Sequence, residues 1–296
     1  MGAMDAPFDM ATLPTGVAMS LSPLVARVLA PNPSPFTYTG TQTYVVGRED
    51  VAVIDPGPAD PGHIAALQSA IAGRTVTAII CTHTHRDHSP AAPPLSALTG
   101  APIIGCAPLA LEDDGPRADA ALDPDYAPDR VLTDGERLGG AGWTLEALAT
   151  PGHTSNHLCF ALLEEQALFT GDHIMGWSTS VVSPPDGDMA AYMRSMQRLV
   201  DRDDVIYYPA HGDPVEKPQR LARSMMGHRR HREGQIIRYL QGNGAALIPD
   251  MVSDMYKGID PRLYPAAGRS VLAHLLDLQT RGLAREHQGQ WEAVAA

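Results

Sequence analysis

The sequence Cys-Thr-His-Thr-His-Arg-Asp-His at residues 81–88 carries four side chains of the kinds that bind metal ions. The apolar run at residues 76–80, directly before it, predicts a buried strand. A strand that ends in a tight loop brings several side chains to one point. Neutral imidazoles together with a carboxylate suit a cation such as Zn²⁺. A lone histidine is usually structural, but four ligand-type residues at this spacing predict a metal site.

Three short motifs follow this stretch: the loop Gly152-His153-Thr154, the turn Thr170-Gly171-Asp172 and the pair His211-Gly212. Together with the spacing His-x-His-x-Asp-His at residues 83–88, they resemble the metallo-β-lactamase superfamily over residues 36–215. The resemblance implies an α/β fold, the αββα metallo-β-lactamase sandwich, in which two mixed sheets pack face to face with helices outside. It also implies a hydrolase.

The resemblance further implies a role for each ligand position. The metal ligands are expected to be His83, His85, Asp87, His88, His153, Asp172 and His211. Three histidines (His83, His85 and His153) would hold one ion, a second group (Asp87, His88 and His211) the other, and Asp172 would bridge them. We expect two Zn²⁺ ions, with iron or manganese as alternatives. Asp87 and Asp172 are the expected catalytic residues, because they would orient a metal-activated hydroxide between two charge-stabilising cations.

Four other features near the motifs have open roles. Asp55 is either a turn-former or a residue that supports the ligands, as in the resembling family. His157 is expected to support the site from behind, and His173 either faces substrate or is structural. Residues 107–130, with four Pro and many acidic side chains, predict a long loop that either flanks the site or is a solvated excursion.

The charge of the chain changes sign near residue 215. Residues 1–215 hold 10 basic and 26 acidic side chains, a balance of −16, whereas residues 216–296 hold 12 and 8, a balance of +4. We therefore expect a catalytic domain at 1–215 and a second domain at 216–296. Helical patterns followed by a hairpin predict a winged-helix unit there; they cover residues 218–242, 249–256, 265–281 and 283–291. Residues 228–236 and 264–271 resemble the winged-helix appendage of the superfamily branch that includes the β-lactamase-like-protein-2 group, whose animal members are endoribonucleases.

The rest of the catalytic part predicts alternating strands and helices. Strands are expected at 36–46, 51–54, 76–80, 103–104, 143–149, 158–163, 167–170 and 205–208, and helices at 61–72, 90–98 and 188–202. Residues 1–35, rich in Pro and Met, predict a surface arm.

Composition narrows the class of protein. With 296 residues, 44% apolar and 19% charged, the chain predicts globular domains. No apolar run is long enough to span a bilayer, so no membrane partner is expected. Residues 1–10 lack a basic residue and an apolar core, so we expect no secretory signal. Three scattered cysteines are too few for a disulfide framework and favour a cytoplasmic protein with reduced thiols.

Two classes of function stay open on this evidence. The first is a hydrolase of an ester-type substrate, with a small molecule or RNA as candidates: an RNA phosphodiester, a thioester, a lactone or a β-lactam. The alternative is a nucleic-acid-binding protein that uses the winged-helix unit, with the metal site secondary. We do not expect sequence-specific DNA binding, because the third C-terminal helix offers mainly Arg269 and Arg281. Our hypothesis is that the basic first helix, with Arg229 and Arg230, attracts anionic substrates to one wall of the cleft. The substrate and a homodimer are left open.

Overall fold

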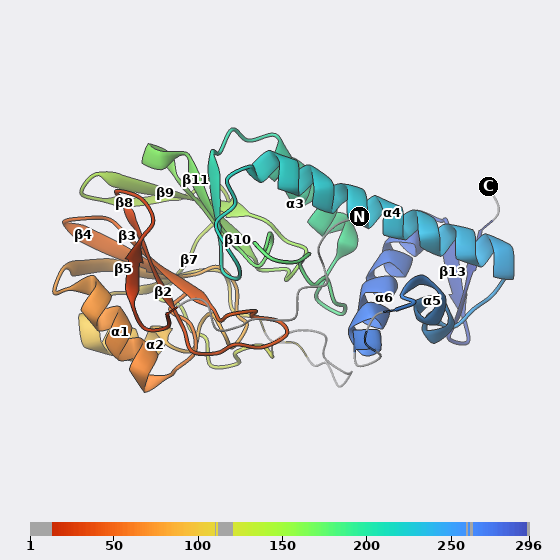
Figure 1. The fold of residues 1–296 in the computed structure, drawn as a ribbon, viewed down its shortest axis with the longest axis horizontal. Helices are drawn as coiled ribbons and strands as arrows, with labels where there is room; N and C mark the ends of the chain where they lie inside the picture. The colour runs from red at the N-terminus through yellow and green to blue at the C-terminus, as the bar shows by residue number, and fades with distance from the viewer. Residues whose placement is uncertain (1–13, 110, 112–120, 259, 261–262, 295–296) are drawn as a thin grey trace.

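Two β-sheets packed face to face form the centre of the larger part of the computed structural model, which describes residues 14–109, 111, 121–258, 260 and 263–294 (Figure 1). The first sheet has the strand order β1 (Ala18–Ser20), β2 (Val25–Leu29), β3 (Gln42–Val46), β4 (Asp50–Ile54), β5 (Thr75–Cys81), β6 (Ile103–Gly105) and β7 (Arg130–Val131). The second has the order β12 (Ile206–Pro209), β11 (Ala167–Gly171), β10 (Leu158–Leu162), β9 (Trp143–Ala149) and β8 (Arg137–Gly140). Both sheets are mixed, because each combines parallel and antiparallel neighbours.

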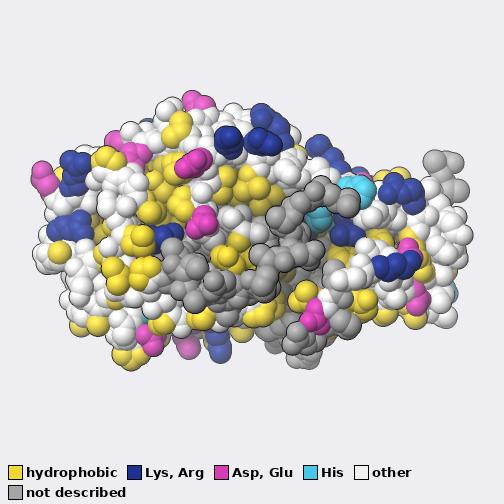
Figure 2. Space-filling model, viewed as in Figure 1, with side chains coloured by type: hydrophobic (Ala, Val, Ile, Leu, Met, Phe, Trp, Pro, Cys, Tyr) yellow, Lys and Arg dark blue, Asp and Glu magenta, His cyan; other side chains and the backbone are white. Residues whose placement is uncertain are grey.

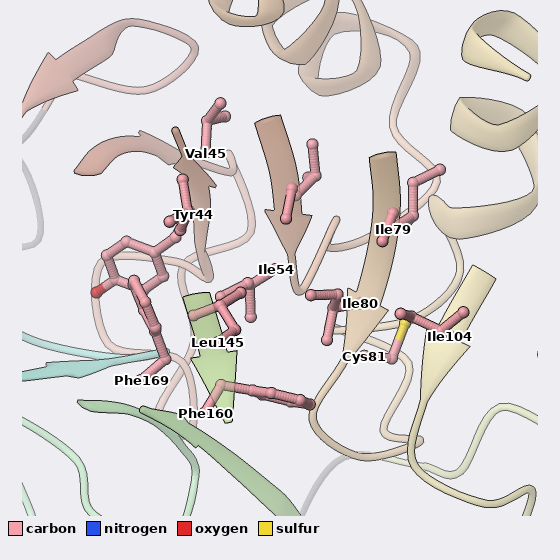
Figure 3. Packing of buried hydrophobic residues seen from close by; sticks show 14 of the residues in the cluster. Tyr44, Val45, Ile54, Ile79, Ile80, Cys81, Ile104, Leu145, Phe160 and Phe169 are labelled. Carbon is pink, nitrogen blue, oxygen red and sulfur yellow. The ribbon is translucent and has the colours of Figure 1, made fainter. Parts of the chain in front are cut away.

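The core between the sheets follows from alternation along the strands. Successive side chains of a strand point to opposite faces, so one set of each strand faces the other sheet. Figure 3 shows Ile54 and Ile80 of the first sheet near Leu145 and Phe160 of the second. On β10 the alternate residues, including Cys159, join a separate apolar cluster on the outer face. Each sheet therefore buries both faces, which explains the nearly continuous apolar strands of the sequence.

Helices cover the outer faces of the sandwich. Helices α1 (Pro61–Ile71) and α2 (Ala92–Thr99) contact the first sheet, and α3 (Met189–Val200) packs on the second through Tyr192 and Met196. The Asp188 carboxylate caps α3 by accepting from the backbone N–H of Ala191 at 2.7 Å. The αββα arrangement expected from the sequence is confirmed.

The C-terminal part consists of three helices and a hairpin, as predicted. They are α4 (Pro218–Asn243), α5 (Ile248–Met255), α6 (Tyr264–Thr280), β13 (Ala284–His287) and β14 (Gln290–Ala293). Ile236, Leu275 and Trp291 belong to its own apolar core. Helix α4 begins beside the sandwich and runs along the whole C-terminal part, and both α4 and α6 contact α3 (Figure 1).

Two sequence predictions near the N-terminus are wrong. Residues 14–35 are not only a surface arm, because β1 and β2 pair with the first sheet and Val28 is fully buried; residues 1–13 lie outside the described part. The strand predicted at 36–46 begins only at Gln42, since Tyr38 (φ 57°) and Gly40 (φ 133°) form a turn. The strand β8 was not predicted at all.

In the described residues, every helix is too short or too polar to cross a membrane.

His274 on α6 is a buried histidine away from the histidine-rich stretch. Its side chain is 1% exposed, and neither ring nitrogen has a hydrogen-bond partner among the described residues. Burial, with the nearby arginines Arg229 and Arg232 adding repulsion, lowers the pKa of His274 to about 3. Folded protein therefore keeps this imidazole neutral down to acid pH.

His274→Leu should make the protein less sensitive to acid. An unfolded histidine binds a proton below a pKa of about 6.5, so acid stabilises the unfolded chain until the folded pKa is reached. From pH 7 to pH 5, we expect the unfolding free energy of the wild type to fall by about 2 kcal/mol more than that of the variant. Urea unfolding at both pH values measures this. His231→Leu, an exposed histidine of α4, is the control and should behave like wild type; equal acid sensitivity of His274→Leu and wild type would contradict the prediction.

Candidate metal centre

The candidate ligands follow the C-terminal ends of four strands at one edge of the sandwich. Strand β5 leads into the loop with the four residues of the 83–88 motif, and β9 leads to His153. Strands β11 and β12 lead to Asp172 and His211. All seven residues are at most 9% exposed, although they come from both sheets. The structure thus brings together every site residue predicted from the sequence.

Three imidazole nitrogens converge in the first cluster. His85 Nδ1 lies 3.0 Å from His83 Nε2 and 3.1 Å from His153 Nε2. The Asp172 carboxylate approaches the same group, with Oδ2 3.9 Å from His83 Nε2 and 3.7 Å from His153 Nε2. These four ligand atoms lie within 4.8 Å of one another and could hold a metal ion.

The second cluster lies on the other side of Asp172. His211 Nε2 lies 3.2 Å and His88 Nε2 3.4 Å from Asp87 Oδ2. Asp172 Oδ1 lies 3.2 Å from His211 Nε2 and 3.6 Å from His88 Nε2. One oxygen of Asp172 therefore faces each cluster.

Unpaired polar atoms in the two clusters indicate that these donors fit metal ions. Three buried polar atoms, Asp87 Oδ1, His88 Nε2 and Asp172 Oδ1, have no hydrogen-bond partner within the described part of the chain. Buried polar atoms normally have partners, and an ion that is not included in a structure is one explanation for an orphan. A cavity of about 20 Å³ lies beside Asp87 and Asp172, enough for a water molecule or an ion.

Residues behind the ligands hold the imidazole rings in orientation. His88 Nδ1 lies 2.9 Å from Asp55 Oδ2, and Thr82 donates to both oxygens of Asp55 through its backbone N–H and its hydroxyl. His153 Nδ1 donates to the Val181 carbonyl at 2.6 Å, and His211 Nδ1 to the Gly40 carbonyl at 3.2 Å. Such partners fix the tautomer and ring orientation of metal-binding histidines. Of the two roles left open for Asp55, the support of His88 is the one observed.

The two remaining histidines of the motifs lie behind the site. His157 Nδ1 pairs with the Thr150 hydroxyl at 2.9 Å, and its Nε2 accepts from the backbone N–H of Asp172 at 3.2 Å. His157 therefore supports the backbone of Asp172 from behind the ligands, as predicted. His173 is fully buried, packs against the Tyr192 ring at 4.7 Å and does not line the cavity. Of its two open roles, the structural one is observed.

Electrostatics differ between the two clusters. Burial lowers the pKa of His85 to about 3 and that of His83 well below its usual value, so these imidazoles are neutral. Burial would also lower the pKa of His211, but the carboxylates of Asp172 and Asp87 outweigh it and raise the pKa to about 10. Burial likewise lowers the pKa of His88, but the nearby carboxylates outweigh burial and raise this pKa well above its usual value. The second cluster thus pairs carboxylates with imidazoles that hold protons in the absence of a metal.

Several residues at the site carry no sequence signal. Phe36, Met175 and Val181 form an apolar lining of the cavity, and only the fold brings them together. The described end of the predicted 107–130 loop does flank the site: the backbone of Asp123 donates to Thr84 at 2.7 Å, and its carboxylate accepts from Ser89 at 2.7 Å. Residues 110 and 112–120 of that loop lie outside the described part.

Comparison with known proteins agrees with this geometry. Residues 37–211 match the Metallo-beta-lactamase superfamily. The chain belongs to this superfamily. Residues 248–291 match the Beta-lactamase associated winged helix domain, which agrees with α5, α6 and the hairpin. The superfamily and its thioesterase-named relatives identify the protein as a hydrolase.

Two curated relatives and one solved structure illustrate the similarity. An Atrochrysone carboxyl ACP thioesterase from Claviceps purpurea is 31% identical over 80% of this chain and 73% of its own length. A Beta-lactamase-like protein 2 homolog from Drosophila melanogaster is 31% identical over 93% of this chain and 94% of its own. A beta-lactamase domain protein from Burkholderia ambifaria shares the fold, with a TM-score of 0.78, 17% identity and 97% coverage of both chains.

Asp55→Ala should destabilise metal-free protein by at least about 3 kcal/mol. The change leaves the Thr82 N–H and His88 Nδ1 without their buried acceptor, and alanine tolerates the positive φ of 48° poorly. Asp55→Asn is the control, because asparagine adopts this conformation and retains one acceptor oxygen; we expect it to lose clearly less. Urea unfolding with a chelator present measures both, and a loss below 1 kcal/mol for alanine would argue against this role.

Proposed function

We propose that this protein is a binuclear metal hydrolase that cleaves thioesters. The observation that carries the substrate class is the lining of the cavity beside the ligands. Apart from the ligand residues, the lining consists of Phe36, Met175 and Val181, all apolar. A phosphodiester would call for a lysine or arginine near the reacting centre, and the described lining has neither.

The relatives support the same substrate class. Several of them are named as thioesterases and align with about four-fifths of this chain. A thioester also suits a site without an additional proton donor, because a thiol with a pKa near 8.5 leaves readily as a thiolate. An alkoxide or amine is a poorer leaving group than a thiolate and depends more strongly on protonation.

The proposed metal ligands are the seven residues of the two clusters. His83, His85 and His153 would hold one ion, Asp87, His88 and His211 the other, and Asp172 would bridge them. We propose Zn²⁺, although the imidazole and carboxylate donors also suit iron. The bound ions would supply Lewis-acid stabilisation of the oxyanion and lower the pKa of water.

The remaining chemistry belongs to the side chains of this chain. Asp87 Oδ1 is buried and has no partner among the described residues, so it is available to accept a hydrogen bond and orient the attacking water. Phe36, 42% exposed, extends from the cavity to the surface and offers an apolar surface to an acyl chain. The lining around the ligands thereby favours apolar acyl groups.

The nucleic-acid-binding alternative has less support. Arg269 of α6 and Arg281, directly after this helix, are both engaged within the protein. Arg281 pairs with Glu233 at 2.6 Å and Asp277 at 3.0 Å, and Arg269 donates to the Ser183 hydroxyl at 3.2 Å. Arginines held in this way are poor candidates for base contacts.

Two further assignments belong to this proposal. We keep the domain boundary near residue 215, because the two matched ranges fall on either side of it. We also keep the cytoplasm as the compartment, because Cys81, Cys106 and Cys159 are free and buried, as in a reducing environment.

A substrate panel tests the proposed class. Metal-loaded protein should hydrolyse an apolar acyl thioester, such as octanoyl-N-acetylcysteamine, with a kcat/KM at least tenfold above that for a single-stranded RNA, a lactone or a β-lactam. Released thiol, RNA fragments and ring opening are each measured directly. Preferred cleavage of RNA would overturn the thioester assignment while leaving the hydrolase assignment intact.

Asp172→Ala should reduce the metal content from two ions per chain to one or none. The change removes the carboxylate that faces both clusters and leaves two cations without a shared negative charge. We expect kcat/KM to fall by at least roughly 100-fold. Elemental analysis of metal-replete protein measures the content, and Asp134→Ala, an exposed carboxylate, is the control. Two tightly bound ions in Asp172→Ala would contradict the bridging role.

A further inference from the structure

Arg229 does not lie on the substrate-attracting surface predicted from the sequence. Its side chain is 4% exposed, whereas the neighbouring Arg230 is exposed. Figure 2 shows blue basic side chains along α4, and the exposed arginines of this helix are Arg220, Arg223, Arg230 and Arg238. Arg229 is therefore the arginine of α4 that the fold buries, and its contacts lie inside the protein.

The buried guanidinium of Arg229 has two contacts in the catalytic part. Its Nη2 donates to the backbone carbonyl of Ser180, and its Cζ lies 5.3 Å from the centre of the Tyr192 ring. No carboxylate of the described residues forms an ion pair with it, and its Nε has no partner there. Burial of an unpaired cation is costly, so an arginine that served only to keep the helix soluble would lie on the surface. The cost points to a specific task for the Ser180 contact.

The segment that Arg229 holds touches both sides of the candidate metal centre. The carbonyl of the next residue, Val181, accepts from His153 Nδ1 at 2.6 Å, and the Val181 side chain lines the cavity. The Ser180 hydroxyl donates at 2.7 Å to the carbonyl of His173, the residue after Asp172. Tyr192, beneath the guanidinium, donates to that same carbonyl at 3.2 Å. Movement of the Ser180 carbonyl would therefore move the acceptor that orients His153.

We propose that Arg229 is a positioning residue through which the C-terminal part sets the metal affinity of the first cluster. This inference rests on the metal sites of the proposed function. By fixing the Ser180 carbonyl, Arg229 fixes the Val181 carbonyl, and that carbonyl holds the His153 imidazole with Nε2 toward the cluster. The imidazoles of the second cluster have supports of their own, Asp55 behind His88 and Gly40 behind His211, so we expect loss of Arg229 to affect the first cluster much more than the second.

Metal binding by full-length protein tests the inference. Metal-free wild type, Arg229→Met and Arg229→Lys are titrated with Co²⁺ against a chelator of known affinity, with the visible absorption bands reporting coordination. We expect Arg229→Met to bind one of the two ions roughly 10–100-fold more weakly and the other with nearly wild-type affinity. Arg229→Lys, which can still donate to the Ser180 carbonyl, should recover part of the loss. Arg230→Met, the adjacent exposed arginine, is the matched control and should bind both ions like wild type.

A purely structural role predicts a different pattern. In that case Arg229→Met lowers the urea midpoint of metal-free protein but leaves both affinities unchanged or weakens both equally, and this result would overturn the inference. Lysine no better than methionine would also overturn it. If Arg229→Met does not fold, Arg229→Lys decides alone: selective weakening of one ion supports the inference, and two wild-type affinities refute it. Failure of wild-type protein to bind two Co²⁺ ions would instead refute the metal sites of the proposed function.

Discussion

The carboxylate of Asp172 faces two groups of imidazoles, and each group combines residues from both sheets. Strand β11 of the second sheet delivers Asp172, whereas the loop after β5 of the first sheet delivers His83 and His88. Asp172 is 8% exposed, and burying a carboxylate is costly unless opposite charge and hydrogen bonds offset it. Part of the offset comes from His211 of the same sheet at 3.2 Å, and part from His88 of the opposite sheet at 3.6 Å. The face-to-face packing of the two sheets is therefore a condition for the site.

A seam of hydrogen bonds between the sheets holds that packing next to the site. The Tyr44 hydroxyl of β3 donates to the carbonyl of Pro209 at 2.7 Å, and the backbone N–H of Gln42 donates to Ala210 at 2.8 Å. The Gln42 side chain donates to Gly212 and accepts from the buried Arg27 at 2.9 Å. His211 thus sits in a segment tied to the first sheet on both sides. Polar groups buried at this edge serve the geometry of the ligands, while the apolar core supplies the stability.

The C-terminal part is joined to the same edge. Helix α4 begins only seven residues after His211 and packs on α3, which in turn covers the second sheet. Its Arg229 meets the segment at residues 180–181 that borders the cavity. The exposed arginines of α4 contribute to the positive balance of this part, whereas Arg269 and Arg281 bond to Ser183 and Glu233. The winged-helix part thus contacts the segment beside the candidate metal centre and also has an exposed basic surface.

The sequence by itself predicted most of the strands and helices and the candidate ligand residues. Strand alternation, the capping residue Asp188 and the 83–88 motif are local properties, since they depend on residues near one another in the chain. The tertiary structure alone decided which oxygen of Asp172 faces which cluster, that β1 and β2 join the first sheet, and that Arg229 is buried while Arg230 is exposed. These features depend on residues distant in sequence: a strand of low periodicity gains its stability from a partner strand, and an arginine is buried only where another element covers it. Sequence patterns carry local preference, whereas burial and pairing across the sheets arise only when the whole chain has packed.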